Sequence, residues 1–438
     1  MENTIRNIIR SRGFLTGAAF AALLAGFTVG LSLFDKGGIA EAQDIVPGST
    51  MVPKFEVDPL WPKPLPNHWV LGETIGVSVD AHENIWVLHR PPGLERNMTS
   101  LTRGEAKCCT AAPDVLKFDE VGNLLHYFGP PQGHDWPSGN HGITIDKDGN
   151  VWIASASAAQ PGPPPGSAEQ FAKHSAGDTF DVETGGEIIK GKYHDSFILK
   201  LSQDGKFLGE IGHANGSKGS LDIDNVRGVA TIRFLPDGTL VAADGYGNHR
   251  VSEWNPKTMK NIRIWGAYGK PPSDDPIPHY NVNSPQFGNP VHCAEPSNDG
   301  LLYVCDRTNN RIQVFKFDGT FVKQYPVAVN TKALGSVWEI AFSKDPAQKF
   351  MYVTDGTNEK IYVFDRQSMK ELYAFGGGGR TPGEFYGAHC IVTDSNGDIF
   401  TTETFSGARV QKFIYKGMVP VSSLLKEHVV GGSIIFQQ

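Results

Sequence analysis

The chain has 438 residues, of which 50 are Gly and 29 are Pro, with 10% aromatic residues and a formal net charge of −7. Turn-forming residues at this density favour many short strands over long helices. The negative charge, with no basic cluster outside the N-terminus, argues against a nucleic-acid partner.

The first 42 residues are predicted to be an export signal. Arg6, Arg10 and Arg12 precede an uncharged run over residues 14–34, and the sequence AEA at 40–42 offers a small-residue cleavage site. The mature protein is therefore expected to be exported, as a periplasmic or secreted protein. The uncharged run is also long enough to span a bilayer, so a membrane anchor over residues 14–34 is the alternative if the signal is not cleaved.

Residues 43–72 are expected to form an extended arm, residues 73–418 a single repeat domain, and residues 419–438 a C-terminal tail. The domain contains six related units in which apolar residues alternate around a turn, as in HGITIDKDGNVWIA at 141–154. Insertions at 91–113, 158–193 and 268–288 lengthen the first three units and are expected to project from one end.

The spacing of these units predicts the fold class. In the units without insertions, the first residues lie 46 positions apart (292 to 338) and 51 positions apart (338 to 389). Four short strands per period of this size are the signature of a propeller blade. The sequence therefore predicts an all-β protein, a six-bladed β-propeller after the export signal. The arm is expected to help close the ring, because an unpaired blade edge invites aggregation.

The first strand of each propeller blade lines the central channel, so the residues that begin the units should form a ring. These residues are Ile75, His141, Arg227, His292, Trp338 and His389. The three histidines belong to alternate blades and should point inward at one height. A lone histidine of this kind would be an ordinary core residue. Three at one repeat offset favour a site for a first-row metal ion with open coordination positions.

Turns at the same end of the units add polar candidates. Tyr246 lies in the segment DGYGNHR at 244–250, Arg90 follows His89, and Arg307 begins the segment RTNNR at 307–311. A tyrosine close to a metal can lose its proton, since the cation stabilises the phenolate. Arginines can hold a carboxylate through two parallel hydrogen bonds. Tyr246, Arg90 and Arg307 are therefore candidate catalytic residues, whereas Arg311 is expected to be structural.

Five cysteines are present, and five cannot all pair internally. Cys293 and Cys305 flank one predicted hairpin, and their pairing is open at this point. Cys293 and Cys390 directly follow ring histidines and are expected to be buried packing residues. Glu295 is a candidate partner for a metal-bound histidine from outside the coordination sphere, which the sequence alone does not show.

The segments around His89, His141, Asp244, Asp306 and His389 resemble those of NHL-repeat propellers, and in particular of the peptidyl-α-hydroxyglycine α-amidating lyase family. The resemblance covers about residues 73–416. It implies that His141, His292 and His389 bind zinc, that Tyr246 is the base acting on the substrate hydroxyl, and that Arg90 is catalytic. It also implies a structural calcium near the channel, held mostly by backbone carbonyls.

The chain departs from that family at several positions. Gly387 stands where the family has a pocket methionine, Arg227 and Trp338 fill ring positions that have smaller or different side chains in the family, and the insertions at 91–113 and 158–193 are its own. The implied reaction splits an N–C(OH) carbinolamide into an amide and an aldehyde acid. The expected substrate is a small-molecule or peptidyl carboxylate.

The leading hypothesis is thus an exported lyase that depends on zinc or another divalent transition metal such as iron. Two alternatives stay open. One is a non-catalytic propeller that binds a protein or a glycan through its loops. The other is a different hydrolytic or redox reaction on the same three-histidine site. The sequence leaves the oligomeric state undetermined.

Overall fold

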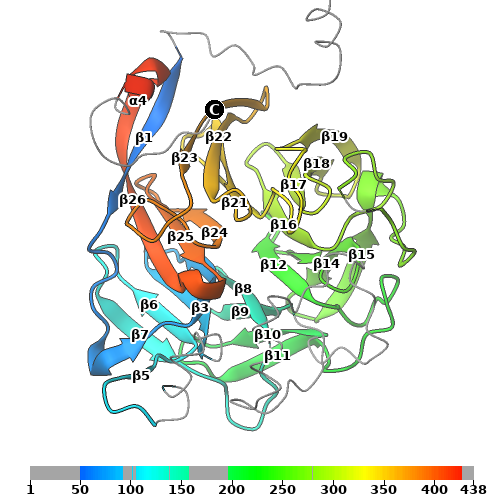
Figure 1. Cartoon of the computed structure of the whole chain (residues 1–438). Helices are drawn as coiled ribbons and strands as arrows, with labels where there is room; N and C mark the ends of the chain where they lie inside the picture. The colour runs from blue at the N-terminus through cyan, green and yellow to red at the C-terminus, as the bar shows by residue number, and fades with distance from the viewer. Residues whose placement is uncertain are drawn as a thin grey trace, which may run out of the picture. The chain divides into compact units, whose positions relative to one another are not determined.

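The computed structural model describes residues 50–91, 101, 105–137, 139–156, 196–278 and 280–426, with side chains to residue 424. Within these residues the protein is almost entirely β, built from six four-stranded antiparallel sheets arranged as blades around a channel (Figure 1). The prediction of a six-bladed all-β propeller is confirmed. The predicted export signal and the insertion at 158–193 lie outside the described residues.

The innermost strand of every blade faces the channel, and consecutive innermost strands contact one another around the ring. The first three blades are β3(Glu73–Val79), β4(Ile85–Arg90), β6(Val115–Phe118) and β7(Leu124–Phe128); β8(Asn140–Ile145), β9(Val151–Ser155), β10(Phe197–Leu201) and β11(Phe207–Gly212); and β12(Val229–Phe234), β13(Leu240–Asp244), β14(Arg250–Asn255) and β15(Lys260–Trp265).

The next two blades are β16(Val291–Pro296), β17(Leu301–Asp306), β18(Arg311–Lys316) and β19(Phe321–Pro326); and β20(Glu339–Phe342), β21(Phe350–Asp355), β22(Lys360–Asp365) and β23(Lys370–Gly376). A short parallel pair, β2(Trp69–Val70) and β5(Thr110–Ala111), lies outside the blades.

The sixth blade joins the two ends of the repeat domain. Its inner strands are β24(Ala388–Thr393), β25(Ile399–Glu403) and β26(Arg409–Pro420), and its outermost strand is β1(Met51–Asp58), from the predicted arm. β1 runs antiparallel to β26, pairing Met51 with Pro420 and Asp58 with Lys412. The blade edge that β26 would otherwise expose is thereby covered by the first described strand. The helix α4(Val421–Lys426) follows β26.

Hairpin turns are held by a repeated aspartate. Asp146 accepts the backbone N–H of Asn150 at 2.8 Å and the indole N–H of Trp152 at 3.0 Å. Asp80 does the same for Asn84 and Trp86 in blade one, at 3.0 and 2.9 Å. These aspartates satisfy backbone donors of the turn and fix the next strand, so the turn beside His141 is scaffold.

Apolar side chains fill the spaces between neighbouring blades. Ile75 and Trp86 of blade one, for example, belong to the same buried cluster as Ile153 and Phe197 of blade two. A disulfide joins Cys293 of β16 to Cys305 of β17, with Cα atoms 4.8 Å apart, and another joins Cys108 to Cys109. Cys390 is a buried free thiol.

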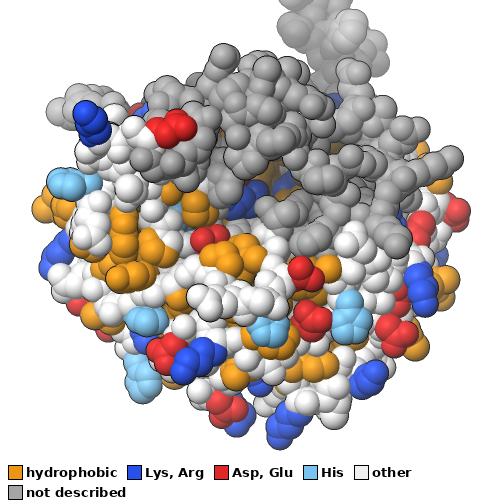
Figure 2. Space-filling view, turned by 90° about the horizontal axis from the view of Figure 1, so that it is seen from below, with side chains coloured by type: hydrophobic (Ala, Val, Ile, Leu, Met, Phe, Trp, Pro, Cys, Tyr) orange, Lys and Arg blue, Asp and Glu red, His pale blue; other side chains and the backbone are white. Residues whose placement is uncertain are grey.

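None of the helices in the described part of the chain is long and apolar enough to cross a bilayer. Figure 2 shows one face of the molecule, on which acidic, basic and histidine side chains are interspersed with apolar ones.

Candidate metal centre

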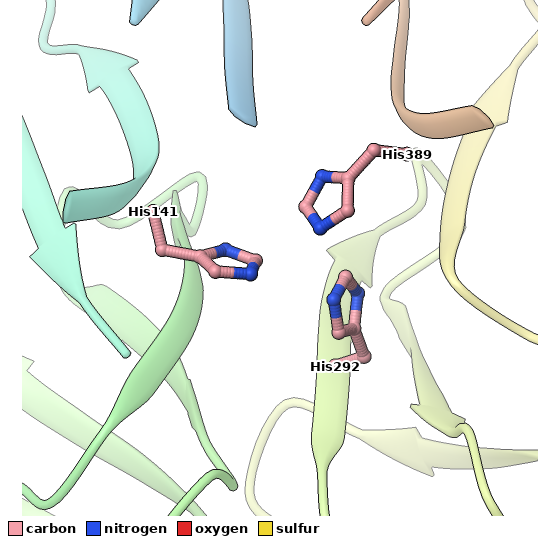
Figure 3. Close-up of side chains that lie close together, drawn as sticks. All are labelled: His141, His292 and His389. Atoms are coloured by element: carbon pink, nitrogen blue, oxygen red, sulfur yellow. The ribbon is translucent and has the colours of Figure 1, made fainter. Parts of the chain in front are cut away.

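Three histidines converge in the channel. His141, His292 and His389 are each the second residue of an innermost strand, in β8, β16 and β24, and each is at most 1% exposed. Their ring centroids lie 4.7 to 5.1 Å apart, and one nitrogen of each lies within 4.8 Å of those of the others. Figure 3 shows the three rings directed toward one another from three separate strands. The structure thus brings the predicted ligands together.

A β-bulge directs each of these side chains. The pairing register shifts directly after the residue that precedes each histidine, at Asn140, Val291 and Ala388. A bulge inserts one unpaired residue and re-aims its side chain. The same device therefore operates in blades two, four and six.

Each histidine is oriented by a backbone carbonyl of the following blade. His141 Nδ1 lies 2.8 Å from the carbonyl oxygen of Ala230, and His292 Nδ1 contacts that of Trp338. The His389 ring hydrogen-bonds the carbonyl of Ile75. A carbonyl only accepts, so Nδ1 of His141 and of His292 must carry the proton. The Nε2 lone pairs of these two rings are then left for a ligand.

The register corrects one predicted ring residue. Val229 pairs with Asp244 in blade three as Val291 pairs with Asp306 in blade four, so Ala230 is the equivalent of His292. Arg227 lies before β12, where its backbone N–H donates to Asp244. The prediction that Arg227 occupies the ring is wrong, because the register places Ala230, three residues further along the chain, at that position.

Tyr246 lies between two of the histidines. Its hydroxyl is 3.1 Å from Nε2 of His141 and 3.1 Å from Nε2 of His292, and it accepts a 3.0 Å hydrogen bond from Nη1 of Arg307. The turn that contains Tyr246 packs closely against the backbone of β16 in blade four. A Cβ added at Gly245 would lie 2.1 Å from the backbone nitrogen of Val291, so this close approach requires glycine.

Burial sets the protonation of the site. It lowers the pKa of His141, His292 and His389 well below the ordinary histidine value. The charge of Arg90 adds to this effect at His141, and the charge of Arg307 adds to it at His292 and His389. Burial raises the pKa of Tyr246, while the charge of Arg307 acts in the opposite direction. The rings are therefore neutral at physiological pH, as metal binding requires.

Arg90 lies beside this centre. Its Nε donates to the carbonyl of Asn140, which directly precedes His141, at 2.9 Å, and its Nη1 pairs with Glu73 at 3.1 Å. The neighbouring His89 is buried, accepts the N–H of Gly72 at 3.1 Å and contacts the carbonyl of Pro113 at 2.8 Å. His89 therefore has a structural role.

Arg311 is also structural, as expected. It pairs with Asp306 at 2.7 Å and donates to the carbonyls of Val282 and Gln286 at 2.9 and 2.8 Å. These bonds tie the segment that enters blade four to the blade itself.

Further along the channel the structure contains an ionic cluster that the sequence interpretation missed. Arg233 pairs with Glu295 at 2.5 Å and with Glu339 at 2.9 Å. Burial raises the pKa of Glu339 to about 8, although Arg233 opposes it. Glu295 was expected beside a histidine and has Arg233 as its partner instead. The signal in the sequence is one arginine and two glutamates within the predicted innermost strands, although the sequence does not show that they meet.

Glu359 supports the last histidine. Its carboxylate accepts the N–H groups of Gly387 and Ala388 at 2.8 and 3.0 Å, directly before His389. Gly387 has φ +93°, and a Cβ there would lie 2.6 Å from the carbonyl oxygen of Thr404. Both the positive φ and the close carbonyl disfavour any side chain at position 387, which accounts for the glycine.

In the described part of the chain, the three histidines are the one group of three or more His, Cys, Asp or Glu side chains spaced to hold a metal ion. Their neutral nitrogens and their burial fit a transition metal. The structural calcium stays a prediction, because backbone carbonyls would supply most of its ligands.

Comparison with known proteins supports the resemblance. An NHL repeat model matches residues 297–315, within blade four. The chain is 21% identical over 394 residues to peptidyl-alpha-hydroxyglycine alpha-amidating lyase 1 of Drosophila melanogaster, covering 83% of this chain and 60% of that protein. It is 25% identical over 266 residues to peptidyl-glycine alpha-amidating monooxygenase B of Xenopus laevis, covering 58% of this chain and 24% of that protein. The chain thus spans only part of the length of these relatives.

Among solved structures, virginiamycin B lyase from Staphylococcus aureus matches with a TM-score of 0.42 and 13% identity, over 83% of this chain and 90% of that one. A streptogramin B lyase matches with a TM-score of 0.43 and 13% identity, over 84% and 98%. The chain is a six-bladed propeller that matches the NHL repeat in blade four and resembles the amidating lyase.

Proposed function

We propose that this protein is an exported, metal-dependent carbon–nitrogen lyase that cleaves the N–C(OH) bond of an α-hydroxy amide carrying a carboxylate. The observation that carries the proposal is the position of the Tyr246 hydroxyl, 3.1 Å from Nε2 of both His141 and His292 and in contact with Arg307. A base, a metal site and a cation are thereby within reach of one small substrate.

His141, His292 and His389 would hold the metal, which is zinc or another divalent first-row ion such as iron. When bound, the metal supplies Lewis acidity that lowers the pKa of a substrate hydroxyl. The carbonyls of Ala230 and Trp338 hold two of the rings in the tautomer that this role requires.

Tyr246 would take the proton of the substrate hydroxyl. Burial raises the pKa of its phenol, with Arg307 opposing this effect, and a cation held by the histidines would further favour the phenolate. As the O–H electrons form the aldehyde C=O, the C–N bond breaks and its electron pair passes to nitrogen. Nitrogen receives a proton from the tyrosine or water, so the products are an amide and an aldehyde acid.

Arg307 and Arg90 would orient the substrate. Arg307 is 2% exposed and contacts the Tyr246 hydroxyl, which places its positive charge beside the reacting oxygen. Arg90 is held near His141 by its bonds to the carbonyl of Asn140 and to Glu73. A carboxylate on the substrate would be attracted by these two guanidinium groups.

Export is part of the proposal. The predicted signal over residues 1–42, or an anchor over residues 14–34, would direct the chain out of the cytoplasm. The Cys293–Cys305 disulfide is compatible with an oxidising compartment.

Elemental analysis of the purified protein combined with an assay for glyoxylate released from α-hydroxyhippurate tests the proposal. One tightly bound transition metal and glyoxylate release are expected, and both should be lost in His141→Ala. Metal without glyoxylate would indicate another reaction at the same site. A protein that binds no metal would indicate a binding propeller.

A further inference from the structure

The residue that directly follows each channel histidine differs among the three blades that supply one. In blade two it is Gly142, which has no side chain. In blade four it is Cys293, whose sulfur is bonded to Cys305. In blade six it is Cys390, a buried free thiol. Of these three positions, the one in blade six therefore offers a hydrogen-bonding side chain beside the histidine.

The thiol of Cys390 bridges the third histidine and the neighbouring blade. Its Sγ lies 3.1 Å from Nδ1 of His389 and 3.0 Å from the carbonyl oxygen of Ile75 in blade one. The register shift between Ala388 and Ile391 interrupts the strand alternation that would separate two adjacent side chains. A carbonyl only accepts, so the thiol donates to Ile75 and turns a sulfur lone pair toward the ring. Nδ1 of His389 then carries the proton, and its Nε2 lone pair is left for a ligand.

A buried carboxylate lies on another side of this sulfur. Oε2 of Glu339 in blade five is 3.5 Å from Sγ of Cys390, and the Glu339 side chain is completely buried. Its other oxygen accepts a 2.9 Å hydrogen bond from Nη2 of Arg233 in blade three. The ionic cluster of the channel is thereby connected to the candidate metal centre through one sulfur atom.

We infer that Cys390 is a positioning residue for the proposed metal ligand His389, and that its thiol fixes the imidazole in the tautomer with a free Nε2 lone pair. Ile75 and Glu339 hold the thiol in the orientation that this role requires. The inference rests on the proposed function only for the presence of the metal, because the tautomer is a property of the metal-free protein as well.

Zinc affinity of the purified protein, measured by competition with a chelator of known affinity, tests this role at the metal. Cys390→Ala should bind zinc about 10- to 100-fold more weakly, as is typical when the partner of a metal-binding histidine is lost. Cys390→Ser keeps a donor and an acceptor at this position and should recover most of the affinity. Thr393→Ala is the matched control, because Thr393 is a buried residue of the same strand and donates to the carbonyl of Phe342 at 2.9 Å. It should bind zinc like wild type.

A double-substitution cycle tests whether Glu339 acts through the thiol. Glu339→Gln keeps the size of the side chain and removes its carboxylate, and it should weaken zinc binding less than Cys390→Ala does. Residues that act through one shared contact give non-additive effects. The double variant should therefore bind zinc as Cys390→Ala does, and losses that add would overturn the role given to Glu339.

The imidazole nitrogen chemical shifts of the metal-free protein report the tautomer directly, with the His389 signals assigned by their absence in His389→Gln. Wild type and Cys390→Ser should show a protonated Nδ1, and Cys390→Ala should show a mixture of both tautomers. A purely structural role of Cys390 would leave the tautomer unchanged.

Three results would overturn the inference: an unprotonated Nδ1 in wild type, wild-type zinc affinity in Cys390→Ala, or a loss in Thr393→Ala or Cys390→Ser as large as that in Cys390→Ala. A wild-type protein that binds no zinc or other transition metal but shows the expected tautomers would contradict the proposed function and leave the role of the thiol supported.

Discussion

The imidazole of His141 in blade two donates a 2.8 Å hydrogen bond to the backbone carbonyl of Ala230 in blade three. The same relation joins His292 to Trp338 and His389 to Ile75. Ring positions therefore alternate between an imidazole and a carbonyl that orients it. A metal bound by blades two, four and six would be coupled through these bonds to blades three, five and one.

Metal removal should therefore destabilise the whole propeller. A ligand present at about a thousand times its Kd stabilises the folded state by about 4 kcal/mol. Calorimetric melting with and without a chelator should show a lower Tm for the stripped protein. Hydrogen exchange should quicken in β3, β12 and β20, although these strands supply no ligand. The His389→Ala variant should have the same Tm with and without the chelator. Faster exchange confined to β8, β16 and β24 would contradict the coupling.

Removing the Tyr246 hydroxyl should slow catalysis strongly while leaving the metal in place. General-base catalysis contributes about 10²- to 10⁴-fold, so Tyr246→Phe should lower kcat of glyoxylate release by about this factor. Tyr280→Phe is the control, since the Tyr280 hydroxyl donates to the Ala333 carbonyl away from the histidines. Full activity in Tyr246→Phe would remove this tyrosine from the mechanism.

Much of this site could be predicted from the sequence, because residues at the same position of successive repeats lie at the same level along the channel axis. His141, His292 and His389 occupy one such position in their units, so they face one another across the channel. Blade three has no histidine to mark the ring position, and there the pattern points to Arg227, whereas the strand register puts Ala230 in the ring. Contacts between blades, such as Arg233 with Glu339, depend on side-chain reach and were equally hidden.

The Cys293–Cys305 disulfide should stabilise blade four next to the proposed metal ligand His292. It closes a loop with a sequence separation of 12, and loops near this size contribute about 3 kcal/mol. Cys293→Ala/Cys305→Ala should lower the free energy of unfolding by about this amount in urea titrations. Cys108→Ser/Cys109→Ser should change it far less, because adjacent residues close almost no loop. An equal effect of the two double substitutions would exclude loop closure as the cause.

Acid should weaken the fold through His89. Burial lowers the pKa of His89 to about 4, whereas an unfolded histidine titrates near 6.5. Between these two pKa values the unfolded chain binds a proton that the folded chain does not bind. The free energy of unfolding is therefore highest above about pH 6.5 and falls by about 3 kcal/mol as the pH drops toward 4. Urea unfolding of the metal-free protein at pH 7.5 and 4.5 measures the fall.

His89→Gln should cost stability at pH 7.5, because Gly72 and Pro113 lose their shared partner. The same variant should lose less than wild type on acidification, since the titrating ring is gone. His68→Gln, at an exposed position, should retain the wild-type difference between the two pH values. If His89→Gln also retained the full difference, the acid sensitivity would have to come from other buried histidines, such as the three in the channel, whose pKa values burial also lowers.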